Sequence, residues 1–148
     1  MHHFHAEQWL ERPVEEVFAF FSDANNLEAI TPRQRNFHIL TPGPIRLEAG
    51  ARIDYQLTLY GVPVKWATLI ESWEPPRQFV DVQLRGPYRA WRHTHRFAAE
   101  GGGTRIFDDV DYELPFGPLG RVVEALWARR EIVKIFGYRT EVIARRFS

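Results

Sequence analysis

The central part of the chain, residues 53–114, alternates apolar and polar residues and is interrupted only by short turns rich in glycine and proline. Alternation with a period of two predicts β-strands that bury one face. Because no crossover helix separates these strands, neighbouring strands must run antiparallel. The pattern predicts a meander of strands over 53–59, 64–71, 79–85, 91–97 and 104–114.

The segment before this meander predicts one more strand, two helices and a short strand. Residues 3–11 alternate as a strand does, and Pro13 suits the first turn of a helix that ends near Phe21. A second, shorter helix ends before Pro32, because the residue preceding proline avoids the helical region. Residues 37–40 form a short strand.

The C-terminal segment changes its apolar period from two to 3.6 residues, which predicts one long helix from Gly117 to Arg146, or two pieces with a break near Trp127. The stripe expected to face the sheet consists of apolar residues at helical spacing: Leu119, Val122, Leu126, Val133, Phe136, Ile143 and Phe147. The whole chain is therefore predicted to be an α+β fold, β-α-α-β6-α, with about seven strands.

The balance of charges argues against a nucleic-acid or anionic-membrane partner. Lys+Arg and Asp+Glu both number 19 and are interleaved along the sequence.

The chain contains no cysteine, which excludes disulfides, thiolate catalysis and cysteine zinc sites. It shows no signal-peptide pattern and no apolar run long enough for a membrane span, so we expect a cytoplasmic protein. A single domain over 1–148, as a monomer or homodimer, is the expectation from length.

The strand from Trp91 to Phe97 carries the clearest functional signal. Its inward face combines Trp91, His93, His95 and Phe97, a mixture of aromatic rings and titratable imidazoles that suits a pocket better than a dry core.

The last strand adds Asp108 and Tyr112 to this face, and a carboxylate beside an imidazole can tune it for proton transfer. The equally weighted alternative is that Asp108 serves only as the hydrogen-bond partner of a buried histidine. A metal held by His93, His95 and Asp108 is a weaker alternative. Only two ligands follow from local spacing, so we expect no metal and no cofactor.

The strand over 79–85 can be interpreted in two ways. By alternation alone, Val80, Val82 and Leu84 would claim the interior. We expect the opposite phase, with Asp81 and Gln83 facing inward, because functional cavities are where patterning rules fail. An outward valine face could then form a dimer contact.

Several local sequences, together with the order of elements, resemble the SRPBCC superfamily. These sequences are Pro75-Pro76-Arg77-Gln78-Phe79, Gly86-Pro87-Tyr88, Trp91-x-His93-x-His95-x-Phe97, Gly103-Thr104, Leu27 to Pro32 followed by Phe37, Phe79-x-Asp81-x-Gln83 and Asp108-x-Val110-x-Tyr112-x-Leu114-Pro115. The resemblance covers nearly the whole chain. It is strongest to the bacterial ligand-binding and polyketide cyclase/dehydrase-like group of these START/Bet v 1-like proteins. It implies a helix-grip fold, a curved antiparallel sheet around a long C-terminal helix with an internal cavity, and it fixes no reaction.

These observations predict a protein that binds a hydrophobic or aromatic small molecule in a cavity on the order of 300 to 1,000 Å³. The expected ligand-binding residues are Tyr55, Trp66, Asp81, Gln83, Trp91, His93, His95, Asp108, Tyr112 and Phe136. The alternative is a cyclase or dehydratase that uses a His-Asp pair on a polyketide-like substrate. A role in protein partnering through an exposed sheet face is a third possibility.

Overall fold

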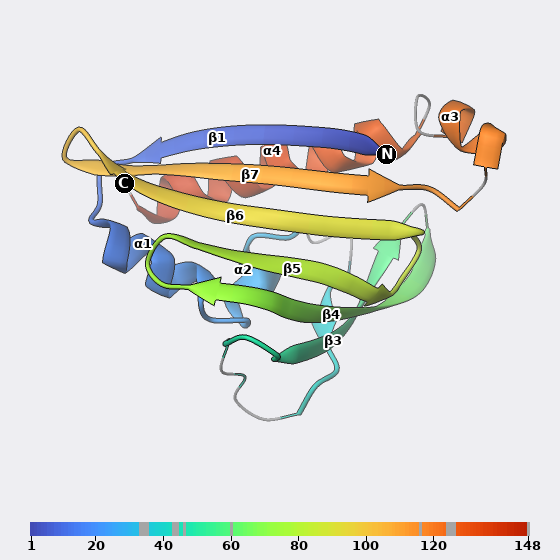
Figure 1. Cartoon of the computed structure of the whole chain (residues 1–148), viewed down its shortest axis with the longest axis horizontal. Coiled ribbons are helices and arrows are strands. Elements are labelled where there is room, and N and C mark those ends of the chain that lie inside the picture. Colours follow the sequence, from blue (N-terminus) through green and yellow to red (C-terminus); the bar gives the residue numbers. More distant parts are fainter. Residues whose placement is uncertain are drawn as a thin grey trace.

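The structure is a computed structural model that describes residues 1–32, 36–42, 45, 47–59, 61–115, 117–123 and 127–147 (Figure 1). Within these residues, seven strands form one antiparallel sheet in the order β1-β7-β6-β5-β4-β3-β2. The strands are β1 (His2–Leu10), β2 (His38–Ile39), β3 (Arg52–Leu59), β4 (Val62–Glu74), β5 (Gln78–Arg85), β6 (Ala90–Glu100) and β7 (Gly103–Glu113). The predicted α+β class and the antiparallel meander are confirmed.

The sheet is a meander from β2 to β7, and the first strand closes it at the far edge. There β1 pairs antiparallel with β7, from His2 opposite Tyr112 to Leu10 opposite Thr104. The two strands run side by side for their whole length (Figure 1). Residues far apart in the sequence therefore meet on this edge of the sheet.

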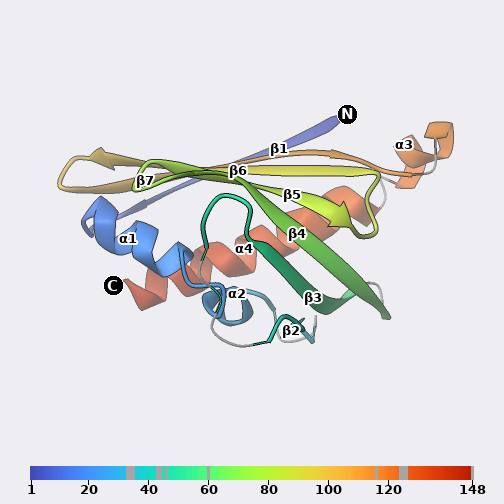
Figure 2. The same cartoon turned by 60° about the horizontal axis from the view of Figure 1, so that its bottom comes forward.

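The main helices lie on one side of the sheet. The helices are α1 (Val14–Phe21), α2 (Asn26–Ala29), α3 (Gly120–Val123) and α4 (Arg129–Arg146), with a 3₁₀ turn at Gly117–Leu119 before α3. Figure 2 shows that α4 crosses the concave face of the sheet, with α1 and α2 beside it. Among the helices in the described part of the chain, none combines the length and apolarity that crossing a membrane requires.

The C-terminal segment follows the predicted alternative of two pieces, but it differs from the prediction in which residues face inward. The segment after Gly117 is divided into a 3₁₀ turn, α3 and α4, and the expected stripe residue Leu126 lies outside the described residues. Ile132 is 2% exposed, whereas its neighbour Val133, expected to face the sheet, is 50% exposed. Leu119 and Val122 are also exposed. The apolar stripe is narrower than predicted because two charged residues of α4 take part of the inward face.

The curvature of the sheet has a visible cause in β4. Its pairing with β5 shifts register between Ala67 and Thr68 and again between Ile70 and Ser72. Such bulges bend a strand and increase its twist.

At the other end of the meander, Gly101 and Gly102 form the two-residue turn between β6 and β7. Their φ values are 57° and 80°, a geometry that glycine adopts without strain.

The buried side chains form four clusters rather than one continuous core. One cluster packs α1 against β5, β6 and β7, and another packs α4 against β1 and β7. The remaining two lie around β3 and β4. Members of all four clusters border a cavity between the sheet and α4.

Candidate functional site

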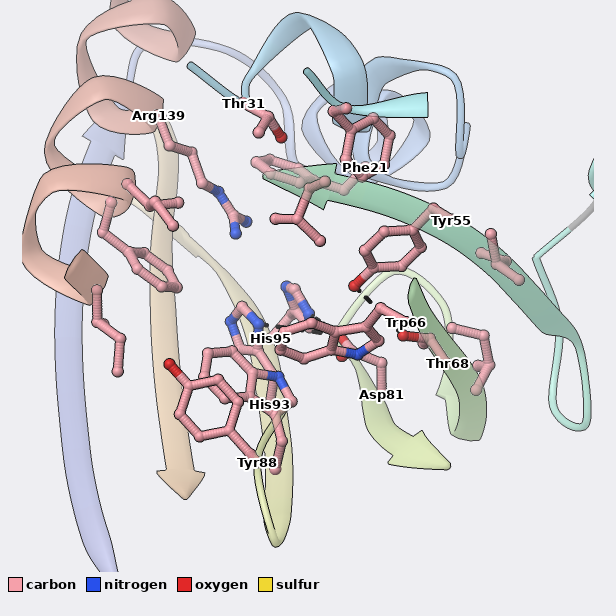
Figure 3. Close-up of a pocket in the computed structure, with 18 of the residues that line it drawn as sticks. Phe21, Thr31, Tyr55, Trp66, Thr68, Asp81, Tyr88, His93, His95 and Arg139 are labelled. Carbon is pink, nitrogen blue, oxygen red and sulfur yellow. Dashed lines mark hydrogen bonds and ion pairs between the residues drawn. The ribbon is translucent and has the colours of Figure 1, made fainter. Parts of the chain in front are cut away.

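The cavity has a volume of about 170 Å³ and opens between the concave face of the sheet and α4 (Figure 3). Its wall is rich in aromatic side chains: Phe21, Phe37, Tyr55, Trp66, Phe79, Tyr88, Trp91 and Phe136. The volume is smaller than predicted, because these large rings pack against one another and occupy much of the space. Trp66 and Trp91, for example, meet edge to face with centroids 5.2 Å apart.

His93 and His95 face this cavity from β6, as the alternation predicts. Each is 5% exposed, whereas Arg92 and Arg96 on the opposite face of the strand are exposed. Asp81 lines the cavity from β5, so the phase that we expected for this residue is the one found. Val80 is nevertheless buried as well, at 3% exposed, which is why alternation alone left this strand ambiguous.

The imidazoles and carboxylates pair diagonally across three strands. In the ladder, Asp81 lies opposite His93, and Asp108 lies opposite His95. The hydrogen bonds cross this register: His93 Nε2–H donates to Asp108 Oδ1 at 2.8 Å, and His95 Nε2–H donates to Asp81 Oδ2 at 2.5 Å. Ionised carboxylates only accept, so these contacts fix the proton of each ring on Nε2. Each imidazole is held in one orientation by a charged partner.

Arg139 of α4 closes the cluster from the helix side. Its guanidinium lies 3.4 Å from Asp108 Oδ1 and over the rings of Phe21 and Phe136, at 5.1 and 5.3 Å from their centroids. Figure 3 shows this side chain reaching from α4 toward the two histidines. A buried guanidinium needs such charged and aromatic neighbours to offset its desolvation.

Burial and charge together set the protonation of the cluster. Burial lowers the pKa of His95 to about 4, and neighbouring His93 acts in the same direction. The ring is therefore neutral at pH 7. Burial acts to raise the pKa values of Asp81 and Asp108. For Asp81 this effect is outweighed by the hydrogen bond from His95, and for Asp108 it is outweighed by Arg139 and His93. Both pKa values therefore lie below their usual range. The cavity wall thus carries the ionised Asp81 beside the neutral His95, with the ionised Asp108 next to it.

Asp81, His93 and His95 also bring three potential metal-ligand atoms within 4.8 Å of one another. The two imidazole rings, however, are stacked, with centroids 3.6 Å apart and an interplanar angle of 25°. The lone pairs of stacked rings lie in two separate, nearly parallel planes, so they do not converge on one ion unless a ring rotates. This arrangement favours hydrogen bonding by the cluster over metal coordination.

Three of the predicted site residues do not line the cavity. Gln83 uses its side-chain amide within the β5–β6 turn, donating to the Tyr88 carbonyl at 2.7 Å and accepting from the Tyr88 N–H at 3.2 Å. Asp108 does not reach the cavity itself but accepts a hydrogen bond from His93, which does. Tyr112 is fully buried among the residues of the α4–β1–β7 cluster. Tyr55, Trp66, Asp81, Trp91, His93, His95 and Phe136 do line the cavity.

The sequence analysis missed several polar lining residues. Arg139 and Glu131 of α4 are 9% and 5% exposed and face the cavity, although only apolar residues of this helix were expected to face inward. Thr68 of β4 donates a long hydrogen bond of 3.5 Å to the Tyr55 hydroxyl. Arg139 lies three residues after Phe136, a helical spacing that could have indicated that this charge shares the inward face of α4.

Comparison with solved structures supports the fold over the full length of the chain. Protein TTHA0849 from Thermus thermophilus is 20% identical, with a TM-score of 0.75, and the match covers 99% of this chain and 100% of that one. Protein CV1439 from Chromobacterium violaceum is 13% identical, with a TM-score of 0.77 and coverage of 99% and 98%. Ginseng major latex-like protein 151 from Panax ginseng is 10% identical, with a TM-score of 0.72 and coverage of 99% and 97%. At these identities the similarity establishes the helix-grip fold alone.

The sequence comparisons place the chain in a family. No curated protein matches it in sequence. A family model described as polyketide cyclase / dehydrase and lipid transport matches residues 10–132, which include the strands from β2 to β7 and the first residues of α4. Together with the helix-grip fold, this match shows that the chain belongs to the polyketide cyclase / dehydrase and lipid transport family, within the SRPBCC superfamily.

Proposed function

We propose that the protein binds a small apolar or aromatic molecule in the cavity, with a polar group of the ligand against the His93–His95–Asp81–Arg139 cluster. The observation that carries the proposal is that an aromatic wall and one localised polar cluster line the same cavity. Ligand sites are typically apolar pockets in which a few polar groups fix the orientation. Family membership supports hydrophobic ligands in general.

The polar cluster argues for a ligand that carries an oxygen or nitrogen function. Trp66 Nε1 and His95 Nδ1 are buried on the cavity wall without a hydrogen-bond partner among the described residues. A purely apolar molecule would leave both atoms unpaired, and each uncompensated buried polar group costs about 1 to 3 kcal/mol. A hydroxyl or carbonyl group on a ring avoids this cost. Because the cavity holds only about 170 Å³, the ligand is expected to be compact.

The binding proposal is tested with freshly purified protein and one defined probe. Native mass spectrometry should reveal a co-purified small molecule, and 2-naphthol, a fluorescent two-ring alcohol, should bind and be displaced by it. Leu57→Trp places a larger side chain on the cavity wall and should abolish 2-naphthol binding. The matched control, Leu84→Trp, alters a 46%-exposed leucine outside the cavity and should bind normally. Equal binding by both variants would contradict a ligand site in the cavity.

Proton transfer is the second candidate function, and the carboxylate-bound imidazoles favour it. Asp108 and Asp81 hold His93 and His95 as an acid/base residue would be held. Against it, a pKa of about 4 makes His95 a weak base at neutral pH. The lowered pKa therefore argues against His95 as the residue that accepts a proton.

Substitution of the histidines separates the two candidates once a ligand is known. If the cluster only binds, His93→Gln and His95→Gln each weaken affinity by about 0.5 to 1.5 kcal/mol, the contribution of one hydrogen bond. If it transfers protons, either substitution lowers turnover by about 10² to 10⁴ while binding persists. We expect the first result, with no conversion of the ligand by the wild type. Binding by calorimetry and turnover by mass spectrometry decide between them.

A further inference from the structure

A second His-Asp cluster lies on the opposite, outer face of the sheet, away from the cavity. It consists of His3 and His5 of β1 and Asp109 of β7, whose ligand atoms all lie within 4.8 Å of one another. Strand pairing places His5 directly opposite Asp109 and His3 opposite Asp111. The site is therefore built on paired backbone rather than on a loop.

One oxygen of Asp109 is the point on which both imidazoles converge. His3 Nε2 lies 3.2 Å from Asp109 Oδ1, and His5 Nδ1 lies 2.6 Å from the same atom. The other carboxylate oxygen, Oδ2, accepts from Arg96 at 3.5 Å, which leaves Oδ1 for the histidines. Ligand atoms around a tetrahedral zinc ion, at bond lengths near 2.0 to 2.2 Å, are roughly 3.3 Å apart. A shift of less than about 1 Å at His5 brings its distance to Asp109 Oδ1 to this value, which the His3 Nε2 distance already matches.

The remaining nitrogen of each ring already has a carboxylate partner. His3 Nδ1 lies 2.7 Å from Asp111 Oδ1, and His5 Nε2 lies 3.2 Å from Glu7 Oε2. Metal-bound histidines typically donate their second ring N–H to a carboxylate, which fixes the tautomer and makes the ligating nitrogen more basic. Both histidines thus present one nitrogen to a common centre and anchor the other.

We propose that His3 Nε2, His5 Nδ1 and Asp109 Oδ1 form a binding site for a divalent transition-metal ion, with Asp111 and Glu7 as the outer carboxylates. Imidazole with carboxylate suits zinc, nickel and copper rather than magnesium or calcium, which prefer oxygen ligands alone. Three protein ligands leave further coordination positions for water. A bound ion would also tie the edge strand β1 to β7.

The test is a calorimetric titration of Zn²⁺ into the metal-free full chain, prepared without an added polyhistidine segment. His5→Ala should lower zinc affinity by more than about tenfold, because it removes a ligand. Glu7→Leu keeps all three ligands and should cost about tenfold, through the outer shell, which is less than the loss in His5→Ala. His38→Ala, an exposed histidine on β2 at the opposite edge, is the matched control and should leave the affinity unchanged.

Two further measurements assign the site. Long-range ¹H–¹⁵N NMR should show zinc-induced shifts at His3 Nε2 and His5 Nδ1, and His93→Gln should bind zinc as the wild type does. Zinc should also raise the unfolding temperature of the wild type, because the ion binds only the folded state, in which β1 and β7 are paired. It should not raise the unfolding temperature of His5→Ala, which lacks one of the three ligands. Absence of zinc binding, undiminished binding by His5→Ala, or loss of binding in His93→Gln would overturn the proposal.

Discussion

Two His-Asp clusters lie back to back on the sheet, and adjacent residues of β7 supply their carboxylates. Asp108 points inward to His93 and His95, and Asp109 points outward to His3 and His5. Both clusters pair imidazole with carboxylate at 2.5 to 3.5 Å. They differ in solvent: the inner side chains are at most 17% exposed, whereas His3 and His5 are 53% and 41% exposed.

Solvent reverses the direction of the histidine pKa shift. On the outer face, hydrogen bonds to Asp111 and Asp109 raise the pKa values of His3 and His5, respectively. On the inner face, burial lowers the pKa of His95 although Asp81 acts in the opposite direction. The same two residue types therefore give a protonatable cluster outside and a neutral, acid-resistant imidazole inside.

The largest expected difference between the clusters is in stability. Asp108→Asn removes the buried charge that faces Arg139 and His93, leaving the guanidinium without its nearest counter-charge. Breaking a buried pair in this way costs roughly 3 to 5 kcal/mol of unfolding free energy. Asp109→Asn acts on an outer-face pair and should cost about 1 kcal/mol or less. Urea unfolding at pH 7 measures both, and equal losses would show that burial does not separate the clusters.

Acidification should reveal how much the buried His95 of the inner cluster contributes to the free energy of unfolding. The pKa of His95 is about 4 in the folded protein and 6.5 in an unfolded chain, so the unfolded chain takes up this proton first as the pH falls. Stability is therefore lost between about pH 6.5 and pH 4, by about 3 kcal/mol at roughly 1.4 kcal/mol per pKa unit. Asp81 and Asp108 also have lowered pKa values, so the stability that these carboxylates contribute is lost only when the pH falls below their ordinary pKa of 3.8.

The outer histidines should act with the opposite sign in the same experiment. Because their folded pKa values are raised, they stabilise the protein below pH 6.5 and lose this contribution as the pH rises through the folded values. Urea unfolding of the wild type and His95→Gln at pH 7.5, 5.5 and 4 separates the two effects. The variant should lose less stability on acidification, and parallel profiles would contradict the inner assignment.

Salt should produce the smallest effect and touch only the outer cluster. At 1 M ionic strength the Debye length is about 3 Å, so charges open to solvent are largely screened. The raised pKa values of His3 and His5 should move back toward 6.5, and that of His95 should stay low. Histidine NMR titrations of chelator-treated protein at about 0.05 M and about 1 M salt test this. A salt-dependent His95 would mean that water reaches the cavity cluster.

The strand pattern predicted the part of the inner cluster that lies on β6 and β7. His93 and His95 share a face by alternation, and Asp108 follows on the next strand. The inward orientation of Asp81 was predicted against the apolar alternation of β5, which places Val80 in the interior. Val80 is in fact buried as well, on the other face of this strand. Arg139 was missed because a helical cation ordinarily faces solvent, and only the closed cavity gives it a reason to turn inward.

The outer cluster could not be predicted from local spacing. His3-x-His5 has the same spacing as His93-x-His95, but its carboxylate partner Asp109 lies on a strand more than a hundred positions away. Only the pairing of β1 with β7 brings the two together. The narrower apolar stripe of α4 had a similar cause, because tertiary packing against the cavity decided which residues turned inward.

The placement of β1 beside β7 also constrains how the protein assembles during synthesis. His3 and Asp111 are 108 positions apart, so the first strand has no partner until nearly all of the sheet has been translated. The β6–β7 hairpin, by contrast, closes across two glycines. Closing long loops is entropically costly and slow, so β1 should dock last, and pulse-labelled hydrogen exchange should find its amides protected after those of β6. Until then the edge of β7 remains open to pairing with another chain.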